Sequence, residues 1–227
     1  MTRSVDGVIF DLDGVLVTTD DLHFRAWKAL ADREGIPFTR GDNERLRGVS
    51  RTESLEIILE KATRTYTDAE RAEMAAWKND RYRALLDTID ASAILPGAID
   101  RLDELAARGV ALAIGSSSKN ARTILDRLNL ISRFRVVVDG GDTARSKPDP
   151  EIFALAVERL GLPPHRCLVV EDAAAGVQSG LAAGCVVLAV GYAAADPVSA
   201  AAAHAAAPSL ADITVDEMLS ITRRGEG

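Results

Sequence analysis

Residues 7–14 read Gly-Val-Ile-Phe-Asp-Leu-Asp-Gly, and this stretch decides how the rest of the chain is interpreted. The apolar run 7–10 is typical of a buried strand, and it ends in Asp11 and Asp13. Because residues two apart in a strand point to the same side, both carboxylates would face one site, where a divalent cation relieves their repulsion most simply. Asp-x-Asp-Gly is also common turn chemistry after a strand, so a turn without a metal is the alternative.

Similar apolar runs alternate with helical patterns along the chain. Runs typical of fully buried parallel strands occupy residues 7–10, 111–115, 136–139, 167–170 and 186–190. They predict an α/β fold with a doubly wound parallel sheet covered on both faces by helices. Ligands of such sheets bind beyond the carboxyl ends of the strands. The Ala-rich stretch 193–207 is interpreted as a surface helix or loops, without a function.

Residues 18–91 break the alternation. They contain helical patterns at 22–34, 51–62 and 67–86 and no strand-like run. We therefore expect an all-helical domain of residues 18–91, inserted into a core of residues 1–17 and 92–227. Two connecting segments favour a hinge, which would let the insertion act as a lid that excludes water.

The composition favours chemistry on a small molecule. The 227 residues are 47% hydrophobic with a formal net charge of -7, so the chain can bury a large core but repels nucleic acid and anionic membranes. No signal peptide is recognised and no apolar run approaches the roughly 20 residues that span a membrane, so we expect a cytoplasmic protein. Cys167 and Cys185 each begin an apolar run, which favours buried thiols over a disulfide or a metal pair.

Four motifs follow one another in the order found in the haloacid dehalogenase superfamily. They are Asp11-Leu12-Asp13-Gly14, Ser116, Ser146-Lys147-Pro148 and Glu171-Asp172. The helical insertion resembles the first type of cap domain of that superfamily. Residues 23–30, 48–51, 78–80 and 118–120 resemble the β-phosphoglucomutase family within it, and the similarity extends over almost the whole chain. This resemblance implies interconversion of β-D-glucose 1-phosphate and glucose 6-phosphate through β-glucose 1,6-bisphosphate.

The acids at the strand ends suit phosphoryl transfer. Asp11 can attack phosphorus to form an aspartyl-phosphate, while Asp13 can give and take the proton of the sugar oxygen. Glu171 and Asp172 end another buried strand and, with Asp11, offer the hard oxygen ligands that Mg²⁺ favours. The resemblance adds the backbone carbonyl of Asp13 to the metal ligands. For Asp172, capping of the following helix is the alternative.

The resemblance also implies the groups that contact the transferring phosphate. Lys147 would bring its ammonium to this phosphate, although its loop position alone favours an ordinary exposed lysine. Ser116 would donate to it from its hydroxyl, and Ser117 would contact it through its backbone amide.

A second phosphate site distinguishes a mutase from a phosphatase, because the far end of a bisphosphate must be held while the near end reacts. The residues that resemble this site are Arg51, Ser118, Lys119 and Asn120. Arg51 can grip phosphate bidentately, and the start of the following helix favours anions. Capping of that helix by Ser118 or Asn120 is the plainer alternative.

The resemblance further implies that the insertion contacts the sugar through His23, Trp27, Gly48, Val49, Ser54 and Lys78. For His23 and Trp27, packing within the helices is the alternative. We expect a monomer whose only partner is a sugar phosphate. Two other functions stay open: a sugar-phosphate phosphatase of the same superfamily, and a catalytically idle regulatory or metal-binding protein that retains the fold.

Overall fold

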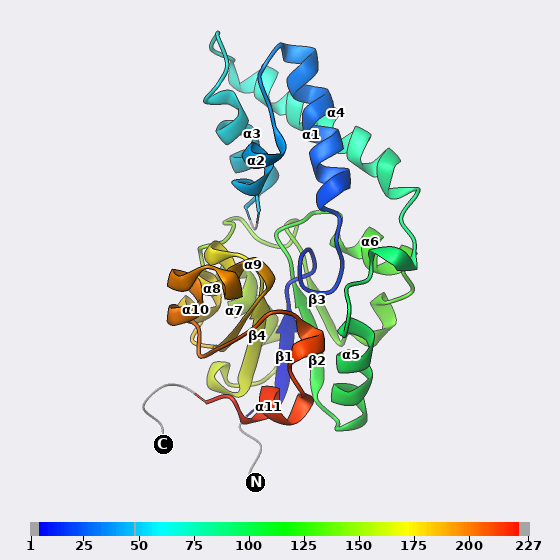
Figure 1. Cartoon of the computed structure of the whole chain (residues 1–227), viewed down its shortest axis with the longest axis vertical. Helices are drawn as coiled ribbons and strands as arrows, with labels where there is room; N and C mark the ends of the chain where they lie inside the picture. Colours follow the sequence, from blue (N-terminus) through cyan, green and yellow to red (C-terminus); the bar gives the residue numbers. More distant parts are fainter. Residues whose placement is uncertain (1–4, 48, 223–227) are drawn as a thin grey trace.

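A six-stranded parallel sheet forms the centre of the protein in the computed structural model, which describes residues 5–47 and 49–222 (Figure 1). The strand order is β3-β2-β1-β4-β5-β6, so the predicted doubly wound sheet is confirmed. The strands are β1 (Gly7–Phe10), β2 (Ala111–Gly115), β3 (Val136–Val138), β4 (Cys167–Glu171), β5 (Val186–Val190) and β6 (Ala205–Ala207).

Both faces of the sheet are covered, because the strands are apolar at consecutive positions. Phe10 points into one cluster and Ile9 into the other, and both side chains are fully buried. The first face packs against α5 (Ala98–Ala107), α6 (Ala121–Arg127) and α11 (Val215–Ser220). The second packs against α7 (Glu151–Leu160), α8 (Ala174–Ala182) and α9 (Gly191–Ala195). Short 3₁₀ helices are η1 (Ala91–Ala93), η2 (Ile131–Arg133), η3 (Pro164–Arg166) and η4 (Leu210–Asp212).

The Ala-rich stretch corrects the interpretation made from the sequence. It forms α9, α10 (Pro197–Ala202) and then strand β6, which pairs in parallel with β5 at the edge of the sheet. The helices agree with the expectation of a surface helix, but β6 does not. Alanine favours helices, so the run carries no strand signal, and backbone pairing to β5 decides its conformation.

The first four α-helices described after β1 form a separate layer above the carboxyl ends of the strands (Figure 1). We call them the cap: α1 (Asp20–Glu34), α2 (Arg40–Glu44), α3 (Arg51–Leu59) and α4 (Asp68–Leu86). The cap has its own apolar cluster, which includes Trp27, Leu30 and Leu55. Capping boxes begin α2, α3 and α4, with Thr39, Ser50 and Thr67 as the N-cap residues. The short helix α2 has no counterpart among the predicted patterns.

The two connections between the cap and the sheet run side by side. Val17 forms a β-bridge with Ile94, and the amide of Thr18 donates to the carbonyl of Ala93 at 2.8 Å. The amide of Leu95 donates back to the carbonyl of Leu16 at 2.9 Å. These bonds make one paired connection where the sequence predicts a hinge.

Two further findings bear on the sequence analysis. Within the described ranges, no helix is both long enough and apolar enough to cross a membrane. Cys167 and Cys185 are buried, and no disulfide joins them among these residues, as predicted.

Candidate active site

A cavity of about 1060 Å³ lies between the cap and the carboxyl ends of the strands. It brings together most of the residues that the sequence singles out: Asp11, Asp13, His23, Trp27, Val49, Arg51, Ser54, Lys78, Ser116, Ser117, Ser118, Lys119, Asn120 and Asp172. Lys147 and Glu171 are not part of its lining but lie fully buried beside Asp11. Gly48 lies outside the described residues.

Lys147 is a fully buried cation beside the acids of the site. Its Nζ donates to Asp11 Oδ1 and to Glu171 Oε1, each at 2.5 Å. Burial lowers the pKa of Lys147, but the charges of Asp11 and Glu171 more than offset this and raise it above its ordinary value. With no exposed surface, Lys147 is not the ordinary surface lysine that its loop position alone favours.

Glu171 contacts Lys147 and helps to fix its position. Its Oε1 accepts from Lys147, and its Oε2 accepts the amide of Ala173 at 3.0 Å. Burial raises the pKa of Glu171 to about 7, although Lys147 opposes the shift. Helix α8 passes so close that a Cβ at Gly176 would lie 1.9 Å from Glu171 Oε1, so only glycine fits there.

Asp172 lies directly after β4 and faces the turn that follows β1. Two features require glycine at position 14: a Cβ there would lie 1.9 Å from Asp172 Oδ2, and its φ is +84°. Burial, followed by the charges of Glu171 and Asp11, raises the pKa of Asp172 well above its ordinary value. The alternative of helix capping is wrong, because the N-cap of α8 is Ala173 and no side chain caps it.

The acids at this edge fit a hard divalent cation, with a smaller ligand set than predicted. Within the described residues, no three side chains of Asp, Glu, His or Cys are arranged as a metal site. Both oxygens of Glu171 already accept hydrogen bonds, which differs from its predicted role as a direct ligand. Asp11 and Asp172 remain as the carboxylates that could bind a metal, beside the backbone carbonyl of Asp13. Their mutual repulsion, seen in the raised pKa of Asp172, is what a cation would relieve.

Asp13 points toward the cap side of the site. The hydroxyl of Thr19, which is buried, donates a hydrogen bond to Asp13 Oδ1. Burial raises the pKa of Asp13 to about 7, the Thr19 bond lowers it, and the charge of Asp11 raises it further. The amide of Gly14 donates to the carbonyl of Val17 at 2.7 Å. The chain therefore turns after β1, and the turn is present together with the pair of acids. The sequence analysis missed Thr19.

A chain of hydrogen bonds runs along the loop after β2. Ser116 Oγ accepts the amide of Ser118, and Ser118 Oγ accepts the amide of Asn120, each at 3.2 Å. Asn120 Nδ2 donates to Asn79 Oδ1 of α4 at 3.0 Å, and its side chain does not cap α6. The alternative of capping is therefore wrong for Asn120, which instead joins this loop to the cap.

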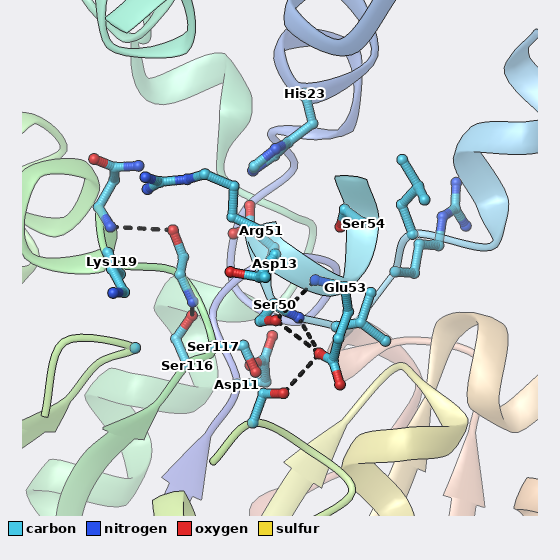
Figure 2. Close-up of a pocket in the computed structure, with 18 of the residues that line it drawn as sticks. Asp11, Asp13, His23, Ser50, Arg51, Glu53, Ser54, Ser116, Ser117 and Lys119 are labelled. Carbon is cyan, nitrogen blue, oxygen red and sulfur yellow. Dashed lines mark hydrogen bonds between the residues drawn. The ribbon is translucent and has the colours of Figure 1, made fainter. Parts of the chain in front are cut away.

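Arg51 faces this loop from the cap. It begins α3, and Figure 2 shows its side chain extending toward the loop that carries Ser116, Ser117 and Lys119. Burial lowers the pKa of Arg51, with the charge of Asp80 acting in the opposite direction. Among the described residues no carboxylate forms an ion pair with Arg51. The guanidinium of Arg51 and the ammonium of Lys119 thus line the cavity on the side away from Asp11 (Figure 2).

Lys78 is the most unusual cation of the cap. Its side chain is 2% exposed, and Nζ lies 2.9 Å from His23 Nδ1 and 4.4 Å from the centre of the Trp27 ring. His23 stacks on Tyr82 with ring centres 4.1 Å apart. Burial and the charge of Arg51 hold the pKa of Lys78 well below its ordinary value. Burial and Lys78 lower that of His23.

Two of these contacts qualify the sequence analysis. Trp27 belongs to the apolar cluster of the cap, so packing is part of its role even though it also lines the cavity. Tyr82 was missed, although its position four residues after Lys78 places both on one face of α4. Ser54 is buried in α3, and Val49 lies before that helix; both line the cavity.

At the cavity rim, Arg47 of the cap reaches the core. Its guanidinium carbon lies 3.5 Å from the centre of the Tyr192 ring, and its Nη2 lies 3.1 Å from Asp20 Oδ2. Tyr192 directly precedes the Ala-rich stretch and is 58% exposed. No sequence signal pointed to Tyr192 as part of the rim.

Comparisons with known proteins find similar sequences and a similar fold. A model of the haloacid dehalogenase-like hydrolase family matches residues 5–184. A β-phosphoglucomutase from Bacillus subtilis (strain 168) is 43% identical over 186 residues, which cover 81% of this chain and 82% of that protein. A fructose-1-phosphate phosphatase from Escherichia coli (strain K12) is 30% identical over 78% of this chain and 92% of that protein.

A solved structure is also similar along almost its whole length. The crystal structure of a β-phosphoglucomutase from Clostridium difficile has a TM-score of 0.86 and 33% identity, and the match covers 93% of this chain and 94% of that one. The similarity therefore includes the cap as well as the sheet.

Proposed function

The chain belongs to the haloacid dehalogenase-like hydrolase family, and from this premise we propose that it is a Mg²⁺-dependent β-phosphoglucomutase. It would interconvert β-D-glucose 1-phosphate and glucose 6-phosphate. The observation that carries the proposal is a pair of separated cationic groups: Lys147, buried behind the cavity wall beside Asp11, and Arg51 with Lys119, which line the cavity away from Asp11. A monophosphate needs one such group, whereas a bisphosphate intermediate needs two.

At the near end, Asp11 would accept the phosphoryl group as an aspartyl-phosphate. Its carboxylate is held by Lys147 Nζ at 2.5 Å, which fixes the direction of attack. Lys147 and the Ser116 hydroxyl would balance the charge on the equatorial oxygens. Asp11, Asp172 and the backbone carbonyl of Asp13 would hold Mg²⁺, which supplies further positive charge to the transferring phosphate. Glu171 would act behind them by holding Lys147.

Asp13 would move the proton. A pKa of about 7 lets this carboxyl donate to the departing sugar oxygen and accept from the incoming hydroxyl near neutral pH. The sugar would lie between Asp13 and the cap residues His23, Trp27, Val49, Ser54 and Lys78, and Gly48 belongs to the same proposal from the sequence alone.

The far phosphate of β-glucose 1,6-bisphosphate would bind Arg51, Ser118, Lys119 and Asn120, whereas the amide of Ser117 would contact the transferring phosphate beside Ser116. Between the two half-reactions the sugar must turn around, so the paired connection at Val17 and Ile94 would open the cap and close it again. All of these groups come from one chain, and we propose that the monomer is active.

The test is a coupled assay with purified protein, Mg²⁺ and a trace of the bisphosphate. The β anomer of glucose 1-phosphate should be converted and the α anomer should not. Asp11→Asn should abolish both turnover and phosphorylation of the protein by acetyl phosphate. Rapid phosphate release from glucose phosphates without isomerisation would overturn the proposal.

A sugar-phosphate phosphatase is the second candidate, because the fructose-1-phosphate phosphatase relative has similar coverage. Arg51→Ala separates the two functions. A mutase should lose isomerisation by roughly 30-fold or more, since a charge-assisted bidentate contact to the far phosphate disappears. A phosphatase acting on monophosphates should change by less than about threefold.

A further inference from the structure

Glu53 connects the cap to the loop of Lys147. Its Oε2 accepts the amide of Ser50 at 2.9 Å and the hydroxyl of Ser50 at 2.7 Å, which closes the capping box of α3. The same oxygen accepts the hydroxyl of Ser146 at 2.6 Å, from a residue 93 positions away in the core. Figure 2 shows Glu53 at the centre of these bonds, between Ser50 and the core.

The neighbours of the two bonded residues give this contact its importance. Ser146 directly precedes Lys147, the cation that holds Asp11. Glu53 lies two residues after Arg51 and one before Ser54, on the first turn of α3. A single carboxylate oxygen therefore links the helix that carries the far phosphate contacts to the loop that carries the near one.

The other capping boxes in the described part of the chain do not make such a link. Asp42 of the α2 box binds Lys61, and Glu70 of the α4 box binds Arg64, in both cases within the cap region. Glu217 of the α11 box bonds to Thr214 of the core. Only the Glu53 box, among these four, accepts a hydrogen bond from the other side of the cavity.

We propose that Glu53 and Ser146 are a positioning pair that holds α3 and the Lys147 loop in register while Asp11 carries the phosphoryl group. The carboxylate strengthens the hydroxyl bond, because hydrogen bonds to charged groups are stronger than neutral ones. With the bond made, the cap covers this side of the cavity and restricts water at Asp11. This proposal rests on the phosphorylation of Asp11 that the proposed function requires.

The first experiment measures the lifetime of the protein phosphorylated by acetyl phosphate in Mg²⁺. Ser146→Ala removes the interdomain bond and leaves the capping box intact. Hydrolysis of the phosphorylated protein should accelerate about 3- to 10-fold, the amount expected for one hydrogen bond of this kind. Ser146→Thr keeps the hydroxyl and should restore the lifetime.

The second experiment tests whether the two residues act as a pair. Glu53→Gln keeps the capping box, in which glutamine is also found, but removes the charge. In the Glu53→Gln background, Ser146→Ala should change the lifetime less than it does in the wild type, because the effects of substitutions at two residues in contact are not additive. Glu217→Gln makes the same change in a capping box of the core and should leave the lifetime unchanged.

The outcomes separate this proposal from the proposed function. A wild-type protein that is phosphorylated but does not isomerise the β anomer would refute the mutase while the lifetimes still test the pair. Lifetimes of Ser146→Ala and Glu53→Gln within twofold of the wild type would overturn the positioning role. Effects that simply multiply in the double variant would overturn the pairing, and circular dichroism of each variant identifies any loss caused by misfolding.

Discussion

Lys78 is a residue whose stability cost is explained by its function. Its ammonium is buried against His23 and two aromatic rings, and within the described ranges no carboxylate forms an ion pair with it. A buried charge without a counter-ion destabilises the fold, and a substrate hydroxyl or phosphate would add a hydrogen-bond acceptor to the contact with His23. The residue is therefore expected to favour binding at the expense of stability.

We predict that Lys78→Met raises the free energy of unfolding by about 1–2 kcal/mol and weakens substrate binding. Because the folded-state pKa of Lys78 is depressed, the wild type gains stability as pH rises toward the unfolded value of about 10.4. The advantage of the variant should therefore shrink over that range. Urea unfolding at several pH values measures it, with Lys28→Met on the cap surface as the control. A Lys78→Met protein less stable than the wild type at neutral pH would contradict this reasoning.

A second residue-scale prediction concerns Thr19 and Asp13. The Thr19 bond lowers the pKa of Asp13, so Thr19→Val should raise that pKa above about 7. A general acid works only while protonated, and activity is lost as pH rises through its pKa. The basic limb of the profile of kcat against pH should therefore move to higher pH in the variant, by about one unit or less. A basic limb that stays in place or moves to lower pH would show that Asp13 does not set it.

Thr19 and Tyr82 also show what the sequence could not give at this scale. Asp11, Asp13, Lys147 and Asp172 stand at strand ends or in motifs, so their positions could be predicted from spacing. Thr19 takes its role from the direction of the Asp13 side chain, and Tyr82 from stacking on His23. Such contacts depend on rotamers and packing between α1 and α4, which periodicity does not specify.

At the scale of elements, the approach of α8 to β4 decides where Lys147 lies. Gly176→Ala would place a methyl group 1.9 Å from Glu171 Oε1. Glu171 would then have to move away from Lys147 and the amide of Ala173. We predict a loss of about 1–3 kcal/mol in unfolding free energy and at least a roughly tenfold loss of turnover, measured by chemical denaturation and by the coupled assay.

The control is a helical glycine without such a neighbour. Gly41 in α2 is exposed, and a Cβ there would meet only Thr39 Oγ1 at 3.7 Å. Gly41→Ala should therefore stabilise the protein by about 0.5–1 kcal/mol, since alanine favours helix. Equal effects of the two substitutions would show that helix propensity, and not contact with Glu171, explains Gly176.

Helices and strands with a strong hydrophobic pattern could be predicted from the sequence. Short elements that depend on backbone pairing or on a capping box could not. The five apolar runs and the three long cap helices correspond to β1–β5 and to α1, α3 and α4. Strand β6 is three alanines, and only its bonds to β5 make it a strand. Helix α2 is five residues long, so it has no room for a hydrophobic period and depends on the Thr39 capping box.

For the whole molecule, the charge balance at the cavity floor predicts a response to Mg²⁺. Four acids, Asp11, Asp13, Glu171 and Asp172, lie near one buried Lys147. A cation that binds only the folded state at 100 times its Kd adds about 2.7 kcal/mol of stability. The thermal midpoint should therefore rise by roughly 5–10 °C in Mg²⁺ and fall back when EDTA removes the metal.

Asp172→Asn provides the comparison. Without metal, this variant should melt at a higher temperature than the wild type, because one charge of the repelling group is gone. It should also lose most of the Mg²⁺ response. A wild-type midpoint that ignores Mg²⁺, or an Asp172→Asn protein that responds fully, would show that these acids do not form the metal site.

The paired connection at Val17 and Ile94 has a geometric consequence for the entire cycle. Two chain segments bonded to each other behave as a ribbon, which bends more easily across its plane than within it. The cap would then swing like a door about one axis. Thr19, next to that axis, would move little and remain close to Asp13, whereas Glu53 of α3 would move away from Ser146 of the core. The position of Asp13 for proton transfer would thus be kept while the cap opens, whereas the bond between Glu53 and Ser146 would exist only when the cap is closed.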